Sequence, residues 1–166
     1  MKKIFKPVLI ASVFTFIIFG SGLIIINSDK TSASTLVPSD QISLNLVNNY
    51  RTQNHLSQLK WNDKLAKAAD DKAQDILNKQ YFDHTSPDGK KAWDFILSED
   101  YSYRFAGENL GVDFDSQEQT FDAWLNSPSH LANIASKNYS DFGFAELTGN
   151  FEGRSTNVFV QMFGKE

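Results

Sequence analysis

The chain has 166 residues, no cysteine and a formal net charge of −4. This length predicts one folded domain with a short appendage. The absence of cysteine excludes disulfide bonds, but a domain of this size buries about two-thirds of its unfolded surface without them. The acidic balance argues against nucleic acid as a partner.

The start of the chain predicts an apolar segment that inserts into or crosses a membrane. Residues 1–6 carry three lysines and form a basic cytoplasmic start, and residues 7–26 form an uncharged apolar run. At about 1.5 Å per residue, such a run spans the roughly 30 Å core of a bilayer as a hydrophobic helix. Because the lysines precede the run, the rest of the chain is expected outside the cytoplasm.

Two fates of this segment stay open. A transmembrane anchor fits the length of the run, because the apolar part of a signal peptide is usually about 7–15 residues long. A cleaved signal peptide fits the small residues that follow at positions 31–33. In either case we expect a polar linker over residues 27–40 and an extracellular domain over residues 41–166, either membrane-anchored or secreted.

The domain is expected to begin with an amphipathic helix over residues 41–55. Ile42, Leu46 and Tyr50, with Val47 beside them, lie at helical spacing and predict its apolar stripe. His55 ends the helix, where the dipole favours a histidine, and we expect it to be exposed.

A second helix is predicted from Asn62 or Asp63 to about residue 79. Its stripe of small side chains allows close packing against a partner, so we interpret this helix as scaffold. The stripe consists of Leu65, Ala68, Ala69, Lys72, Ala73 and Ile76.

A tight turn is predicted at residues 86–89, which read Ser-Pro-Asp-Gly. Proline suits the second position of such a turn and glycine the fourth. His84 precedes the turn in a polar loop, where a lone histidine is more often a surface residue than a ligand. A short helix is expected over residues 91–98, with Trp93, Ile96 and Leu97 facing inward.

One acidic residue stands in an apolar setting. Glu108 lies in the sequence Ala-Gly-Glu-Asn-Leu-Gly, close to Phe105. This setting predicts partial burial, and a buried carboxylate needs partners. Two interpretations stay open: a structural salt bridge or turn, and a ligand or general base.

Residues 124–134 predict the end of one helix and the start of another. Ser116 and Gln119 fit a capping box that opens the first of these helices. Ser127 is a favourable N-cap and Pro128 a favourable first residue of the second helix. His130 therefore falls in the first turn of a rigid element, near the positive end of its dipole.

The C-terminal part predicts an antiparallel hairpin. Residues 139–147 and 155–163 both alternate, with a turn between them, and both faces hold apolar side chains. In the second stretch the faces are Val158, Val160 and Met162 on one side and Phe159, Gln161 and Phe163 on the other. Helices followed by a hairpin predict an α+β fold in which helices cover a small antiparallel sheet.

Four stretches in this order resemble the bacterial branch of the CAP superfamily. That superfamily takes in cysteine-rich secretory proteins, insect antigen 5 and plant pathogenesis-related proteins, and its domain is also called the SCP domain. The stretches are FDHTSPDG at 82–89, AGENLG at 106–111, WLNSPSHLANI at 124–134, and the hairpin DFGFAEL with NVFVQMFG. The resemblance covers residues 42–164 and implies an α-β-α sandwich with a central antiparallel sheet and an open cleft.

The resemblance also implies a binding cleft at His84, Glu108 and His130, which match the family's two histidines and the acid of its GEN motif. Some family members hold a divalent metal such as zinc there, so the three residues are candidate metal ligands. Glu108 and His130 are candidate catalytic residues. The larger eukaryotic pattern has a second acid three residues after the helix tryptophan, where this chain has Ser127, and its loss weakens the expected metal affinity.

Three functions stay open. The resemblance favours a binding module for a lipid, a cell-wall component or a protein. The alternative is a metal-assisted (zinc) hydrolase or peptidase, since two imidazoles and a carboxylate are the ligand set of catalytic zinc sites. Against a committed hydrolase, the chain lacks an HExxH motif, a cysteine nucleophile and a GxSxG elbow. The third possibility is that the cleft residues serve stability alone.

Overall fold

The computed structural model describes residue 36 and residues 38–166. The predicted apolar segment at residues 7–26 and most of the linker lie outside the described residues. None of the described helices is long and apolar enough to cross a membrane. The elements are α1 (Pro38–Gln53), β1 (Lys60–Trp61), α2 (Asp63–Lys79), α3 (Ala92–Ser98), β2 (Phe105–Val112), α4 (Gln117–Leu125), α5 (Pro128–Ile134), β3 (Asp141–Phe151) and β4 (Arg154–Lys165).

A four-stranded sheet forms the centre of the fold, in the order β1-β3-β4-β2. The predicted hairpin is confirmed as β3 and β4, and β2 adds to the other side of β4, also antiparallel. The two-residue strand β1 pairs parallel to β3. Sequence analysis did not assign β2 as a strand. Gly107, Asn109 and Gly111 are poor strand formers, so the local pattern concealed it.

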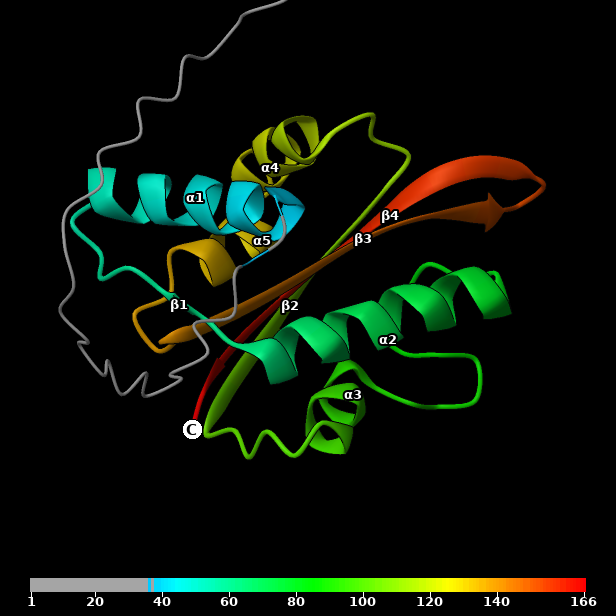
Figure 1. Cartoon of the computed structure of the whole chain (residues 1–166), viewed down its shortest axis with the longest axis horizontal. Coiled ribbons are helices and arrows are strands. Elements are labelled where there is room, and N and C mark those ends of the chain that lie inside the picture. Colours follow the sequence, from blue (N-terminus) through cyan, green and yellow to red (C-terminus); the bar gives the residue numbers. More distant parts are fainter. Residues whose placement is uncertain (1–35, 37) are drawn as a thin grey trace, which may run out of the picture. The chain divides into compact units, whose positions relative to one another are not determined.

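Helices cover both faces of the sheet, as the predicted α-β-α sandwich requires (Figure 1). Helices α2 and α3 pack on one face, where β4 contributes Val158, Val160 and Met162 to the core. Helices α1, α4 and α5 pack on the other face, where β4 contributes Phe159 and Phe163. The alternation read from the sequence of β4 therefore sorts its side chains correctly between two cores.

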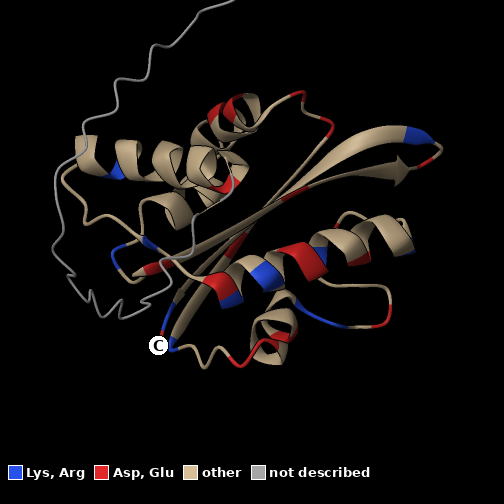
Figure 2. Cartoon of the chain, in the orientation of Figure 1, with Lys and Arg blue, Asp and Glu red and all other residues tan. Residues whose placement is uncertain are grey.

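Helix α2 lies closest to the sheet. Asn62 caps it by accepting hydrogen bonds from the backbone N–H groups of Lys64 and Leu65. At Gly143 in β3, an added Cβ would lie 2.2 Å from the backbone nitrogen of Ala66. Glycine at this position thus permits the close approach that the small side chains of α2 also favour. Acidic and basic positions alternate along the outer surface of the helix (Figure 2).

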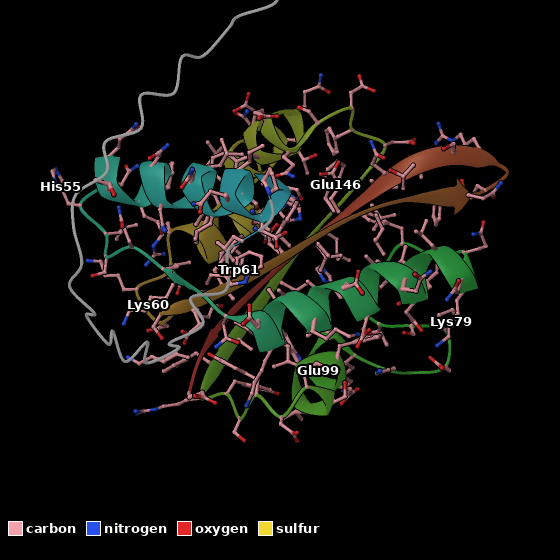
Figure 3. All side chains as sticks on the ribbon, viewed as in Figure 1. His55, Lys60, Trp61, Lys79, Glu99 and Glu146 are labelled. Carbon is pink, nitrogen blue, oxygen red and sulfur yellow. The ribbon has the colours of Figure 1, made fainter. Side chains whose placement is uncertain are left out.

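Helix α1 buries most of the predicted stripe. Val47 is buried, and Leu46 and Tyr50 pack against the core, whereas Ile42 is 41% exposed. Ser43 and Arg51 are buried as well, and the Arg51 guanidinium finds backbone carbonyls as partners inside the protein. His55 projects outward beyond the end of α1, as predicted (Figure 3).

Candidate functional site

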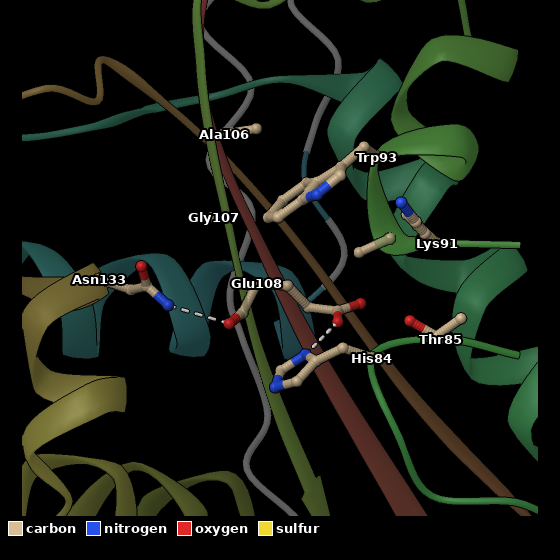
Figure 4. Close-up of a pocket in the computed structure, with 9 residues that line it drawn as sticks. His84, Thr85, Lys91, Trp93, Ala106, Gly107, Glu108 and Asn133 are labelled. Carbon is tan, nitrogen blue, oxygen red and sulfur yellow. Dashed lines mark hydrogen bonds and ion pairs between the residues drawn. The ribbon is translucent and has the colours of Figure 1, made fainter.

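The structure brings His84 and Glu108 into direct contact. Nδ1 of His84 donates a hydrogen bond to Oε1 of Glu108 over 2.6 Å (Figure 4). Glu108 comes from the middle of β2, and His84 from the loop between α2 and α3. The side chain of Glu108 is 1% exposed, whereas that of His84 is 62% exposed. The exposed imidazole of His84 therefore connects the buried carboxylate of Glu108 to the protein surface through a hydrogen bond.

A buried lysine holds the loop that carries His84. Lys72 is 0% exposed, and its Nζ donates to the carbonyls of Asp83 and His84 at 2.8 and 3.2 Å and to the hydroxyl of Tyr81 at 2.9 Å. The ammonium also lies 5.5 Å from the centre of the Phe95 ring. Burial lowers the pKa of Lys72, and the nearby carboxylate of Glu108 acts in the opposite direction. Sequence analysis placed Lys72 in the apolar stripe of a scaffold helix; a lysine at a buried position was the signal of this role.

A second group on α2 fixes the other end of the same loop. Oδ2 of Asp75 accepts hydrogen bonds from the hydroxyls of Tyr81 at 2.7 Å and Ser86 at 2.6 Å. Ser86 begins the predicted tight turn, in which the N–H of Gly89 donates to the Ser86 carbonyl over 2.8 Å. The turn is therefore confirmed, and the loop is tied to α2 on both sides of His84.

Three side chains fix the outer edge of β2, which carries Glu108. Each donates a hydrogen bond to a carbonyl that no neighbouring strand takes up. An edge strand with its carbonyls occupied in this way is protected against pairing with another chain and is held in place. The donors are the Tyr139 hydroxyl to Ala106 at 3.1 Å, the Asn133 amide to Glu108 at 2.9 Å and the Trp124 indole to Leu110 at 2.8 Å.

Gly107 permits this arrangement. A Cβ at this position would lie 2.5 Å from the hydroxyl of Tyr139 and 2.8 Å from Oδ1 of Asn133. Both distances are far below a normal contact. The glycine before Glu108 therefore makes room for the two side chains that hold the strand.

His130 lies near the pair but has a different partner. It is in the first turn of α5, as predicted, and its Nδ1 shares a hydrogen bond of 2.8 Å with Oγ of Ser127. Ser127 is the N-cap residue, yet its hydroxyl makes no capping bond to the helix because the imidazole takes it. The carbonyl of His130 accepts a hydrogen bond of 3.2 Å from Asn109 in β2. The second histidine is thus fixed to the same strand through its backbone.

The environment shifts the proton affinities of the two histidines in opposite directions. The hydrogen bond from His84 to Glu108 raises the pKa of His84. Burial lowers the pKa of His130, and the positive charge of His84 lowers it further. Burial also raises the pKa of Glu108, although its contact with His84 opposes this shift. His84 and Glu108 consequently share a proton as a pair, while His130 favours the neutral form.

A cavity of about 370 Å³ opens over the pair. Glu108 has one carboxylate oxygen, Oε2, that is buried and has no hydrogen-bond partner among the described residues. His130 is not part of the cavity wall. The residues that line it are His84, Thr85, Lys91, Ala92, Trp93, Ala106, Gly107, Glu108 and Asn133 (Figure 4).

The predicted ligand set fits zinc only in part. Within the described part of the chain, no three His, Cys, Asp or Glu side chains are grouped so that they could hold a metal ion. Oε1 of Glu108 is engaged by His84, and Nδ1 of His130 is engaged by Ser127, whereas Nε2 of each histidine has no hydrogen bond to a described residue. Oε2 of Glu108 is buried without a partner among the described residues. The assignment of His84, Glu108 and His130 as metal ligands stays a prediction.

Several known proteins are similar to this chain in sequence or in fold. Uncharacterized protein YkwD of Bacillus subtilis is 34% identical over 141 residues, which cover 82% of this chain and 52% of YkwD. The chain thus spans about half the length of that relative. An outer surface protein of Borrelia burgdorferi has a TM-score of 0.69 and 25% identity, with 76% of this chain and 91% of the Borrelia protein covered.

A third similar protein is an extracellular protein of Bacillus anthracis that contains an SCP domain. Its structure has a TM-score of 0.67 at 23% identity and covers 79% of this chain and 44% of its own, which shows a shared fold. The family profile described as the cysteine-rich secretory protein family, CAP, matches residues 44–163. Since this match takes in both core layers and the whole cleft, the chain belongs to the cysteine-rich secretory protein (CAP) family.

Proposed function

We propose that this protein is exported and binds a ligand in the cleft at His84 and Glu108. The described residues form a CAP domain, and its relatives include an extracellular protein and an outer surface protein. The apolar run at residues 7–26 would anchor the protein in the membrane or direct its secretion. The domain then meets lipids, cell-wall components or other proteins outside the cell.

One observation carries the binding proposal: Glu108 lines the cavity, and its buried Oε2 has no hydrogen-bond partner among the described residues. A buried polar atom without a hydrogen bond costs about 1–3 kcal/mol. In a site built only for stability, such an atom is a defect. In a binding site, the ligand supplies the missing donor.

The lining of the cavity favours a ligand that has a polar donor group beside an apolar face. Trp93 offers an aromatic surface, and Lys91 and Asn133 offer further polar contacts around the carboxylate. Pockets of this kind bind by apolar contact and take their specificity from a few polar groups. A cell-wall component with amide or amine N–H groups matches this chemistry better than the acyl chain of a lipid.

The zinc hydrolase alternative has one observation in its favour. His84 and His130 have pKa values shifted in opposite directions beside a buried carboxylate, which is how acid and base groups are separated in catalytic sites. A metal on these residues would supply a bound water that is acidic enough to attack a carbonyl. Elemental analysis of the purified protein tests it, with His130→Ala as the variant expected to lose both zinc and turnover.

Calorimetric titration tests the binding proposal directly. The full-length protein is titrated with soluble peptidoglycan fragments and, separately, with phospholipid vesicles. We expect saturable binding of the fragments, weakened about tenfold or more by Trp93→Ala, because a buried aromatic contact dominates many interfaces. Leu97→Ala is the control, since Leu97 lies on the same helix, is 51% exposed and does not line the cavity. The absence of a binding signal with both the fragments and the vesicles would contradict the proposal.

A further inference from the structure

A second cavity lies away from the His84 cleft and has a different chemical character. Its volume is about 290 Å³, and it is formed by the end of α1, the loop that follows it, and the segment between α5 and β3. It shares no lining residue with the first cavity. The lining residues are Arg51, His55, Leu56, Ser57, Lys137 and Tyr139.

Arg51 forms the base of this cavity. The residue is 1% exposed, and its Nε donates to the carbonyl of Ser57 at 2.7 Å. Its Nη1 donates to the carbonyls of Ile134 and Ser136, both at 2.8 Å. The two Nη1 contacts satisfy carbonyls at the C-terminal end of α5, where a positive charge is favourable.

The rest of the guanidinium has no partner among the described residues. Nη2 carries two N–H donors, and the hydrogen bonds of Arg51 to the described chain all come from Nε and Nη1. Arg51 also forms no ion pair with a described residue, and the only cause acting on its pKa is burial, which lowers it. Nη2 is not among the described buried atoms that lack a partner, so its N–H donors are accessible from the cavity that Arg51 lines.

The cavity wall adds one further cation, Lys137, and no negative group. Lys137 and His55 are both exposed, and none of the six lining residues is acidic. Figure 3 shows His55 at this end of α1. A guanidinium nitrogen with free N–H donors, inside a cavity that has a lysine at its mouth, is matched by an anionic oxygen.

We propose that this cavity is a binding site for an oxyanion, a phosphate or carboxylate group, held by the Nη2 edge of Arg51 and by Lys137. It is independent of the ligand proposed for the His84 cleft. Nη2 would donate to the anion through its own N–H groups, because Nε and Nη1 are occupied by carbonyls, and Lys137 would add a flexible charge. A bound oxyanion would also give the guanidinium a counter-charge, since Arg51 forms no ion pair with a described residue.

Titrations followed by NMR test this site in the full-length protein. Sodium phosphate, sodium acetate and sodium chloride are added at matched ionic strength, and the Nε–H signal of Arg51 and the amides of His55 and Lys137 are followed. We expect saturable shifts of these signals with phosphate, acetate or both, and none with chloride. The anion that saturates assigns the group: phosphate alone a phosphate site, acetate alone a carboxylate site, both a general oxyanion site.

Two charge reversals separate a local site from general attraction. Lys137→Glu removes a rim charge without touching the hydrogen bonds of Arg51, and we expect it to weaken binding about tenfold or more, as the loss of a charged contact does. Lys60→Glu makes the same change in net charge at an exposed residue outside the cavity and should leave affinity unchanged. Equal weakening in both variants, or no saturable shift in the wild-type protein, would overturn the proposal.

Discussion

Nζ of Lys72 and the backbone carbonyl of His84 are joined by a hydrogen bond of 3.2 Å. The lysine is fully buried, and the histidine is the exposed partner of Glu108. A scaffold helix thus determines the position of a cleft residue that is twelve positions further along the chain. The cleft depends on α2 as much as on the motif that contains His84.

We expect Lys72→Met to lower the free energy of unfolding by about 2–4 kcal/mol. The substitution keeps most of the apolar volume but removes the donor of the Asp83 carbonyl and one of the two donors of the His84 carbonyl, which still accepts from the N–H of Ala92. An unpaired buried carbonyl costs about 1–3 kcal/mol. Urea denaturation measures the change. Lys67→Met on the same helix is the control, since its side chain is 52% exposed, and we expect a change below about 0.5 kcal/mol. Similar losses in both variants would show that the buried network does not hold the loop.

The two cleft histidines should titrate on opposite sides of the ordinary value near 6.5. The contact with Glu108 raises the pKa of His84, and burial with the charge of His84 lowers that of His130. NMR titration of the ring protons measures both. Glu108→Gln should bring the midpoint of His84 back toward the ordinary value because the charged partner is lost. Identical midpoints for the two rings would contradict the described pairing.

The same shifts fix the sign of the pH dependence of stability. His84 has a raised pKa when folded, so its contribution is fully present below the ordinary value and is lost as pH rises through the raised one. His130 has a lowered pKa when folded, so its contribution is present above the ordinary value and is lost as pH falls through the lowered one. Thermal unfolding of His84→Asn and His130→Asn, measured at pH values on both sides of about 6.5, separates the two contributions. In the His84 variant, the melting temperature should fall less steeply as pH rises above this value.

Gly107→Ala should disturb the edge of β2. The new methyl group would meet the Tyr139 hydroxyl and Oδ1 of Asn133 at distances that no side chain tolerates, and overpacking of this kind costs about 1–3 kcal/mol. Chemical denaturation measures the loss. Combining Gly107→Ala with Tyr139→Phe removes one of the two clashing oxygens, so part of the stability should return. A strictly additive double variant would show that the clash lies elsewhere.

Trp124→Phe should cost more than Trp61→Phe. The Trp124 indole donates to the carbonyl of Leu110 over 2.8 Å in a buried setting, whereas that of Trp61 donates to an exposed carboxylate of Asp63 at 2.9 Å. Loss of the buried donor leaves an unpaired carbonyl at the edge of β2, at a cost of about 1–3 kcal/mol. The free energy of unfolding of each variant gives the comparison. Equal costs would argue against the role assigned to Trp124.

The strongest sequence patterns predicted the fold well. The stripe of α2 predicted its length and its buried face, and the alternation of β4 predicted which side chains enter each core. Both patterns are periodic and long, so no single residue decides them. Sequence analysis missed strand β2 and the burial of Arg51 in α1, because the glycines and the asparagine of β2 and this arginine take positions that tertiary contacts stabilise.

The cleft was predicted in part. The resemblance brought His84 and Glu108 together correctly, and the apolar setting of Glu108 predicted its burial. The hydrogen bond that turns Ser127 toward His130 was missed, because a serine before a proline is ordinarily a helix cap. Sequence analysis placed Lys72 on a scaffold helix and gave it no role in the cleft. Its partners in the loop are backbone carbonyls, and no sequence pattern predicts such contacts.

The central claim is that the unpaired carboxylate oxygen of Glu108, Oε2, serves a ligand and not the fold. Glu108→Gln tests it most directly, with affinity for soluble peptidoglycan fragments and stability measured on the same protein. We predict a loss of affinity of about tenfold or more with a change in unfolding free energy below about 1 kcal/mol, because the cost of burying the carboxylate disappears together with its charge. Glu118→Gln, at an exposed position of α4, is the control and should change neither quantity. Unchanged affinity in Glu108→Gln with a loss of several kcal/mol of stability would contradict the claim and make Glu108 a structural residue.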